Sequence, residues 1–336
     1  MNSKIQKKLI KEIIEIIGKE KIIEYHKKSI FPTIVSLTHI YISLIISFIF
    51  IYYLDRYVNF IFFLILGLLL QIFISTRISA LNVLVHEGSH YNISDHKKLN
   101  DTITNWFIGA CILYDVDMYK STHLKHHSFL GGALDPDYSL YAPKTIYNFK
   151  KDILSDIFLI TTFKRARSYL TYKSPSSKKI KNNFKHYYRK LFINSIIFGF
   201  FLFFFIPLKA ILYYSVFWII PLMCFFPIIV RFRTLVEHYF DKKDEAMFVA
   251  RTTITSHLGH YFIGSKMEYH FQHHLFPNIP YHNLKKLHNT MTDLDYFNKS
   301  KYLTQTDNLS GGYYIFFKKY KEKKKLKYKI NLKSSH

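Results

Sequence analysis

Four stretches of this chain carry no charged side chain over a length that matches the thickness of a lipid bilayer. They cover residues 33–54, 58–76, 191–208 and 210–230, and a membrane-spanning helix needs about 20 consecutive apolar residues. The connections within each pair of stretches are so short that only a tight turn fits. Inside a bilayer only helices and closed barrels satisfy every backbone hydrogen bond. The sequence therefore predicts an all-α integral membrane protein with four transmembrane helices in two hairpins.

The positive charge of the chain is distributed unevenly. The net charge is +24, and almost all Lys and Arg lie in residues 1–30, 77–190 and 231–336 rather than in the hairpin turns. Because positively charged loops stay in the cytoplasm, we expect both termini and the central segment there, in a bacterial inner membrane. No nucleic-acid-binding motif accompanies the basic residues. The expected contacts are therefore with membrane lipids and not with nucleic acid.

Composition divides the chain into three parts. Residues 1–30 are Lys-rich and amphipathic, which predicts a helix lying along the membrane surface. Residues 31–300 form the membrane domain, in which residues 105–116 are apolar but too short to span and fit a re-entrant or interfacial segment. Residues 301–336 form a basic tail, for which anionic lipid headgroups and water are both open as surroundings.

Nine of the 18 histidines gather in four places. Two places share the spacing His-x-x-His-His, a third has the spacing i, i+4, and the fourth is a single residue. The nine are His86, His90, His123, His126, His127, His238, His270, His273 and His274. Residues i, i+3 and i+4 lie on one helix face, so each triplet is predicted to aim three imidazoles at one point. All four places follow a predicted span on the same side, which predicts a cytoplasmic helical cap that holds a dimetal site.

The number of imidazoles indicates two metal ions. A zinc site takes four ligands, whereas nine nitrogens match two metals with four or five each. Imidazole suits iron, copper, zinc and nickel, so the residues alone leave the metal open. His257 and His260, spaced i, i+3, are interpreted as background.

Two other classes of protein fit parts of this pattern. His86-Glu87-x-x-His90 is the spacing of a zinc protease with Glu87 as general base, but a protease leaves seven clustered histidines unexplained. A metal transporter would carry its histidines inside the spans, where only His39 lies.

The order and spacing of three histidine boxes around two hairpins carry a specific resemblance. HEGSH at 86–90, HLKHH at 123–127 and HFQHH at 270–274 resemble the membrane fatty-acid desaturase and hydroxylase superfamily, from about residue 33 to residue 297. Further motifs look most like a bacterial branch that includes dihydrorhizobitoxine-type desaturases. These motifs are Asp135-Pro136-Asp137, Arg231-x-Arg233-x-x-x-Glu237-His238, Arg251-Thr252-Thr253 and the run from His274 to Leu284. The family often has Asn shortly before the last box, where this chain has Met267, Glu268 and Tyr269.

The resemblance implies a non-haem di-iron centre, O2 as oxidant and a fatty-acyl or lipid-like substrate. It makes the nine clustered histidines iron ligands and favours desaturation over hydroxylation. Carboxylates are expected to orient the imidazoles, and the candidates are Asp101, Asp135, Asp137 and Glu237. A turn or cap is the alternative for Asp135 and Asp137.

Electrons are expected to come from outside the chain. Its two cysteines cannot hold an iron–sulfur cluster, and no Gly-x-Gly-x-x-Gly fingerprint is present. A soluble donor such as a ferredoxin with its reductase is therefore the expected partner.

Overall fold

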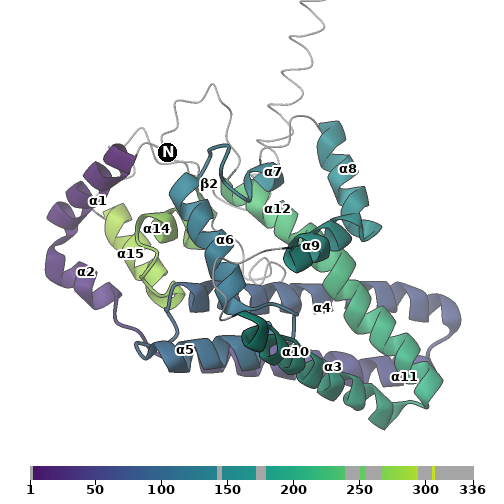
Figure 1. Cartoon of the computed structure of the whole chain (residues 1–336). Helices are drawn as coiled ribbons and strands as arrows, with labels where there is room; N and C mark the ends of the chain where they lie inside the picture. Colours follow the sequence, from purple (N-terminus) through teal and green to yellow (C-terminus); the bar gives the residue numbers. More distant parts are fainter. Residues whose placement is uncertain are drawn as a thin grey trace, which may run out of the picture.

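The chain folds into two helical hairpins that carry a helical cap at one end (Figure 1). The computed structural model describes residues 3–141, 146–171, 179–238, 250–253, 267–293 and 305–306. Four helical segments in this part of the chain are long and apolar enough to cross a membrane, namely Phe31–Tyr57, Phe60–Ser89, His186–Phe204 and Pro207–His238. The predicted number and pairing of transmembrane helices are therefore confirmed.

The first hairpin consists of α3 (Phe31–Tyr57) and α4 (Phe60–Ser89). Only Val58 and Asn59 separate the two helices, and the Asn59 side chain accepts a hydrogen bond from the Phe62 N–H, which caps α4. The first half of α4 exposes large apolar side chains, as a lipid-facing helix should. Its second half, from residue 74 to residue 89, is buried throughout. One continuous helix thus runs from the far membrane face into the cap.

The second hairpin pairs α10 (Lys179–Phe204) with a composite rod. The rod consists of α11 (Pro207–Tyr214), the π-helices η2 (Ser215–Ile219) and η3 (Pro221–Phe225), and α12 (Phe226–His238). Pro221 and Pro227 lack an N–H and interrupt the α-helical hydrogen bonds at the π-helical section. At the far end Lys209 Nζ lies 2.9 Å from Asp55 Oδ2, which ties the tips of the two hairpins together.

Short helices and one pair of two-residue strands follow or connect the hairpins. They are α5 (Lys97–Ile103), the π-helix η1 (Thr104–Gly109), α6 (Val116–Phe129), α7 (Tyr138–Tyr141), α8 (Ile146–Ile157), α9 (Ile160–Thr171), β1 (Thr252–Thr253), η4 (Met267–Tyr269), α14 (His270–Leu275), α15 (Tyr281–Asp293) and β2 (Gln305–Thr306). Strands β1 and β2 pair in parallel.

The apolar stretch 105–116 turns back without spanning. It forms η1 and a turn that pack on α4, with Ile108 and Ile112 in the main hydrophobic core. A Cβ at Gly88 would lie 2.1 Å from the Thr104 hydroxyl oxygen, so glycine is what lets this segment approach α4.

The N-terminal segment forms two amphipathic helices that pack against the cap. It forms α1 (Ser3–Ile17) and α2 (Lys19–Tyr25), which are amphipathic as expected. Leu9, Ile13 and Ile22 are buried in a core shared with α14 and α15, so this part of the apolar face packs on protein. The Tyr25 hydroxyl also bonds the Thr290 hydroxyl at 2.7 Å. Amphipathicity predicted a helix with one covered face, but the cover is protein (Figure 1).

Candidate metal centre

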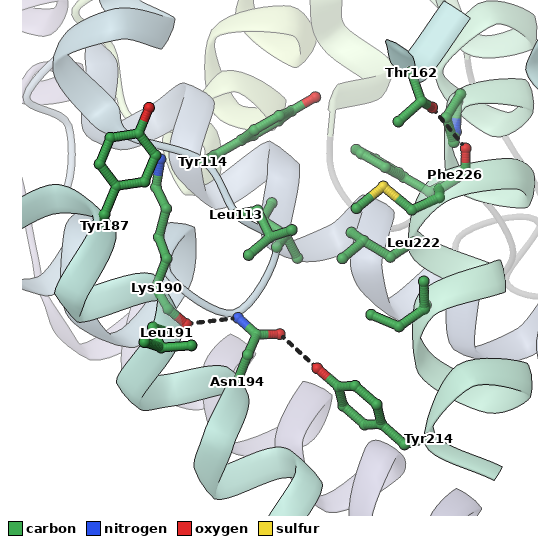
Figure 2. A pocket seen from close by; sticks show the side chains of 14 residues that line it. Leu113, Tyr114, Thr162, Tyr187, Lys190, Leu191, Asn194, Tyr214, Leu222 and Phe226 are labelled. Atoms are coloured by element: carbon green, nitrogen blue, oxygen red, sulfur yellow. Dashed lines mark hydrogen bonds between the residues drawn. The ribbon is translucent and has the colours of Figure 1, made fainter. Parts of the chain in front are cut away.

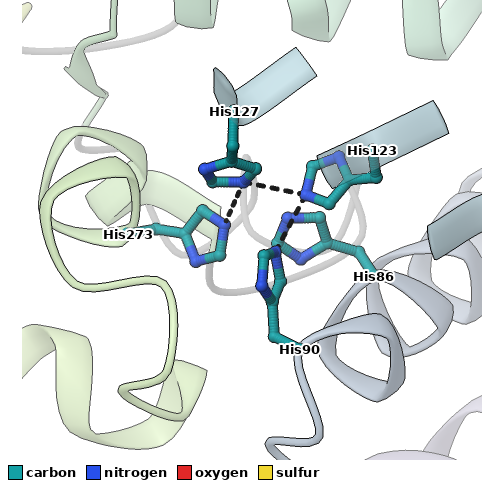
Figure 3. A group of neighbouring side chains, drawn as sticks. All are labelled: His86, His90, His123, His127 and His273. Atoms are coloured by element: carbon teal, nitrogen blue, oxygen red, sulfur yellow. Dashed lines mark hydrogen bonds between the residues drawn. The ribbon is translucent and has the colours of Figure 1, made fainter. Parts of the chain in front are cut away.

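All nine clustered histidines meet inside the cap, where they form two groups. The five-histidine cluster comprises His86, His90, His123, His127 and His273. The four-histidine cluster comprises His126, His238, His270 and His274. In each cluster the potential ligand atoms lie within 4.8 Å of one another. Figure 3 shows the five-histidine cluster, to which α4, α6 and α14 each contribute.

The triplets divide differently from the prediction. Neither triplet aims three imidazoles at one point: His123 and His127 join one cluster while His126 joins the other. In the second triplet His270 and His274 stay together and His273 crosses over. The reason is helix geometry, because successive residues turn by about 100° and adjacent side chains diverge by that angle. Residues i and i+4 therefore join the same cluster, and residue i+3 joins the neighbouring one.

The geometry suits metal ions better than hydrogen bonds. The Nε2 atoms of His123 and His127 lie 2.9 Å apart, and those of His123 and His90 lie 3.0 Å apart. In the other cluster His270 Nε2 lies 2.7 Å from His238 Nε2 and 3.1 Å from His274 Nε2. One ring nitrogen cannot serve two such neighbours as a donor and an acceptor at once. Nitrogens bound at about 2.1 Å around one metal would lie about 3 Å apart.

The burial of the ring nitrogens and the lowered pKa values of the clustered histidines also favour metal binding. His86 Nε2 is buried and has no hydrogen-bond partner among the described residues. Burial lowers the pKa of His90 to about 3. Burial first, and neighbouring imidazoles second, hold the pKa values of His123, His270 and His273 well below 6.5. The rings are thus neutral at physiological pH, which is the form that binds metals.

Asp135 orients the ring of His126 through its Nδ1 atom. Its Oδ1 accepts a hydrogen bond from His126 Nδ1 at 2.8 Å, so the Nε2 atom of that ring faces the cluster. The carboxylate also accepts from the Tyr141 hydroxyl and, at 3.3 Å, from the Gly131 N–H. Burial alone would raise the pKa of Asp135, but the bonds from His126 and Tyr141 hold it below its usual range. Gly131 has φ of 75°, which favours glycine at this turn.

The other three candidate carboxylates lie differently. Asp137 Oδ2 is 3.9 Å from His126 Nδ1, at the edge of the same contact. Glu237 Oε2 is 3.9 Å from His270 Nε2, on the side where the ligand nitrogens meet, and its Oε1 is 3.3 Å from Arg233 Nε. Asp101 accepts a hydrogen bond from the Asn100 amide at 3.0 Å, and its described contacts include no clustered histidine.

Sequence reasoning missed the structural role of Glu87. Its Oε2 accepts hydrogen bonds from the Tyr281 N–H at 2.9 Å and from Asn92 Nδ2 at 3.2 Å, and its Oε1 lies 3.4 Å from His86 Nδ1. Glu87 is therefore anchored by the Tyr281 backbone and by Asn92 beside the Nδ1 atom of the His86 ring. The sequence hinted at this role only by placing Glu87 next to His86. The other partner, Tyr281, is 194 residues away along the chain, so no local pattern connects it with Glu87.

Gln272, inside the last box, was also missed. It accepts from the Thr252 hydroxyl at 2.8 Å and bonds His288 Nδ1 at 2.9 Å, which braces α14 against β1 and α15. Residues 267–269 lead into this helix without an Asn, as the sequence indicated. His257 and His260 lie outside the described residues.

The fold and the site define an all-α integral membrane protein with two buried histidine clusters that can hold metal ions. The profile of the fatty acid desaturases matches residues 58–306 of the chain. This match covers more than half of the sequence, and the protein belongs to the fatty acid desaturase family, a family of oxidoreductases. No curated protein sequence matches the chain.

Proposed function

We propose that this protein is an O2-dependent non-haem di-iron desaturase that introduces a double bond into a fatty-acyl or lipid-like substrate. The observation that carries the proposal is the five-plus-four arrangement of imidazoles in a membrane protein of this family. In the proposal each cluster holds one iron, and all nine histidines are ligands. Bound iron would supply the activation of O2 and the cleavage of C–H bonds.

The residues of the chain have defined tasks in this chemistry. Asp135 fixes the tautomer of His126, and Glu87 lies behind His86, which keeps their ligand nitrogens turned inward. The clustered rings are themselves nearly closed to water, since His86, His126 and His274 are each 2% exposed. The overall reaction removes two hydrogens from adjacent carbons and reduces O2 to two waters, so it consumes two further electrons and two protons.

An external donor must supply these electrons. A ferredoxin with its reductase, docked on the cytoplasmic side of a bacterial inner membrane, fits the basic character of the chain, since small acidic donors are attracted to basic surfaces. Purified protein with substrate and O2 alone should be inactive, and the donor system should restore turnover, less so at high salt. Repeated turnover without any reductant would contradict the proposal.

The membrane orientation can be tested separately. Reporter fusions after Tyr57 and after Lys209 should score as external, and fusions after Lys179 and at the C-terminus as cytoplasmic. An external Lys179 fusion would place the cap on the wrong side for a cytoplasmic donor.

A hydroxylase on the same scaffold is the alternative. Both reactions begin at a C–H bond and differ in whether oxygen enters the product, and the resemblance to the dihydrorhizobitoxine-type branch favours desaturation. The experiment compares the lipids and small metabolites of cells with and without the gene by mass spectrometry. Products lighter by two hydrogens support desaturation, and products heavier by one oxygen support hydroxylation.

Metal analysis tests the proposal against the zinc-protease alternative. Detergent-purified protein should contain close to two irons per chain. One zinc per chain, with no iron after reconstitution, would favour a protease instead.

A further inference from the structure

The turn that follows α4 places an aromatic side chain at the surface of the cap, directly after a clustered histidine. Tyr91 follows His90, and its φ of 58° is a left-handed conformation that few side chains adopt. Backbone hydrogen bonds hold this turn, because the N–H groups of Tyr91 and Asn92 donate to the carbonyls of Gly88 and Glu87 at 3.1 and 3.0 Å. Asn92 is buried, whereas Tyr91 is only half-buried. The turn thus keeps the Tyr91 ring at the surface.

Two lysines from different helices gather around this ring. Lys120 Nζ, on α6, lies 3.2 Å from the centroid of the Tyr91 ring, and Lys97 Nζ, on α5, lies 5.5 Å from it. An aromatic face attracts a cation within about 6 Å through its quadrupole. This contact orients an ammonium group without neutralising it. Lys97 is exposed and Lys120 is half-buried, so water reaches both positive charges.

One side of α6 connects these charges with the metal centre. Lys120, Leu124 and His127 are spaced i, i+4 and i+7, which places them along one side of the helix. Leu124 is 45% exposed. His127 is half-buried, whereas the other four members of the five-histidine cluster are buried. We call the surface formed by Tyr91, Lys97, Lys120 and Leu124 the Tyr91 patch.

Acidic side chains near the Tyr91 patch reduce its positive charge but do not cancel it. Asp95 pairs with Lys28 at 3.2 Å. Burial and neighbouring carboxylates raise the pKa of Asp117, and the charge of Lys120 lowers it, so this carboxyl lies near the patch. Helix α5 adds a further exposed lysine, Lys98. The balance of charge around the ring is therefore positive.

Lys190, another lysine near the metal centre, has different surroundings. It is 7% exposed and runs along the wall of a mostly apolar cavity of about 560 Å³ (Figure 2). Its charge interacts with the carboxylate of Asp115 inside the protein. A soluble protein cannot approach an ammonium group buried in this way. The lysines of the Tyr91 patch, by contrast, are open to such a partner.

We propose that the Tyr91 patch is the docking site of a small, acidic, soluble one-electron carrier. Electron-transfer partners meet through small interfaces, and an aromatic ring and a leucine beside lysines suit an acidic partner. A carrier docked there lies next to His127 and one residue from His90. The inference rests on the proposed function, which requires a donor, and adds where that donor binds. Each encounter oxidises the carrier by one electron and reduces the metal centre by one, so two encounters supply the two electrons of one desaturation.

The test measures the dissociation constant of an acidic [2Fe–2S] ferredoxin for detergent-purified, iron-loaded protein. Cytochrome c, a small carrier of the opposite charge, is the second probe. The ferredoxin should bind saturably and more weakly as salt is added, and cytochrome c should not bind. Lys97→Glu and Lys120→Glu should each weaken ferredoxin binding by about tenfold, because each reverses one charge of the patch. The iron content of both variants should match the wild type.

A matched variant carries the same charge reversal elsewhere on the cap. Lys151→Glu lies on α8, which is well separated from α5 in Figure 1, and its side chain is exposed. It should change ferredoxin affinity by less than about twofold.

Two variants of Tyr91 test the ring itself. Tyr91→Phe keeps the aromatic face and should bind ferredoxin as the wild type does. Tyr91→Asn suits the left-handed backbone but removes the ring that orients both lysines. It should weaken binding by about threefold or more.

Four results would overturn the proposal. They are no saturable ferredoxin binding to the wild type, equal binding of cytochrome c, wild-type affinity in the Lys97→Glu/Lys120→Glu double variant, or an equal loss in Lys151→Glu. A separate measurement reports the proposed function. Wild-type protein reduced with dithionite and then given substrate and O2 should form the desaturated product without ferredoxin. Absence of that product alongside intact ferredoxin binding would contradict the desaturase proposal and support the docking site.

Discussion

Five imidazoles meet in one cluster and four in the other, and the two sets are supported differently. In the four-histidine cluster His126 donates to the buried carboxylate of Asp135, and Glu237 lies near His270 on the ligand side. In the five-histidine cluster Glu87 lies behind His86, and His127 is only partly buried. The four-histidine cluster thus has more carboxylate groups nearby than the five-histidine cluster. If the two proposed metals have the same coordination number, the metal in the four-histidine cluster can bind one more external ligand.

The largest effect is expected from removing one ligand in either cluster. His270→Ala should lower the iron content from two toward one per chain by emptying the four-histidine cluster, and His123→Ala should do the same to the other. Both variants should lose desaturation below detection, since the proposed chemistry needs both metals. Metal analysis and product assay give the two readouts. His96→Ala, at an exposed residue, is the control and should match the wild type. Two irons per chain in His270→Ala or in His123→Ala would contradict the assignment of that residue as a ligand.

The next largest effect is expected at Asp135, and the neighbouring Asp137 provides the comparison. Asp135→Asn removes the charge that orients His126 and should weaken metal binding or activity by about 10–100-fold. Asp137→Asn is the matched control: its side chain is 42% exposed and 3.9 Å from the same nitrogen, so a change of less than about threefold is expected. Chelator titration of the loaded protein measures both. Equal losses in the two variants would mean that total charge, and not the Asp135 contact, matters.

The sequence predicted the fold and predicted that nine histidines gather in the cap, but not how these histidines divide into two clusters. A long stretch without charged residues predicts a transmembrane helix whatever it packs against. Histidine boxes that follow such helices on one side of the membrane are expected to lie together in one cap. The division of His126 from His127 depends on how α6 is rotated against α12 and α14, which no local pattern encodes. For the same reason the cover over Leu9 and Ile13 was assigned to lipid: amphipathicity identifies a covered face but not what covers it.

The buried glutamates offer a third comparison, with a smaller expected effect. Glu237→Gln removes the charged partner that the buried Arg233 has among the described residues and should loosen iron in the four-histidine cluster. Glu87→Gln keeps an oxygen for the Tyr281 N–H and should retain both irons, with activity lowered by roughly tenfold at most. Iron release followed during chelation distinguishes the two variants. A Glu87→Gln protein that loses iron faster than Glu237→Gln would reverse the roles assigned to the two carboxylates.

The smallest effect on turnover is expected at His288, a histidine outside both clusters. Its sequence context gave no reason to expect a role, but its Nδ1 lies 2.9 Å from Gln272 Nε2, and both side chains are buried. His288→Ala should leave a buried amide without its partner and reduce stability by about 1–3 kcal/mol. Activity should stay within a few-fold, because Gln272 braces α14 without meeting the clusters. His288→Gln, which can restore an acceptor, should recover part of the melting temperature lost in His288→Ala. Loss of iron in His288→Ala at temperatures where the protein remains folded would instead make the brace part of the metal centre.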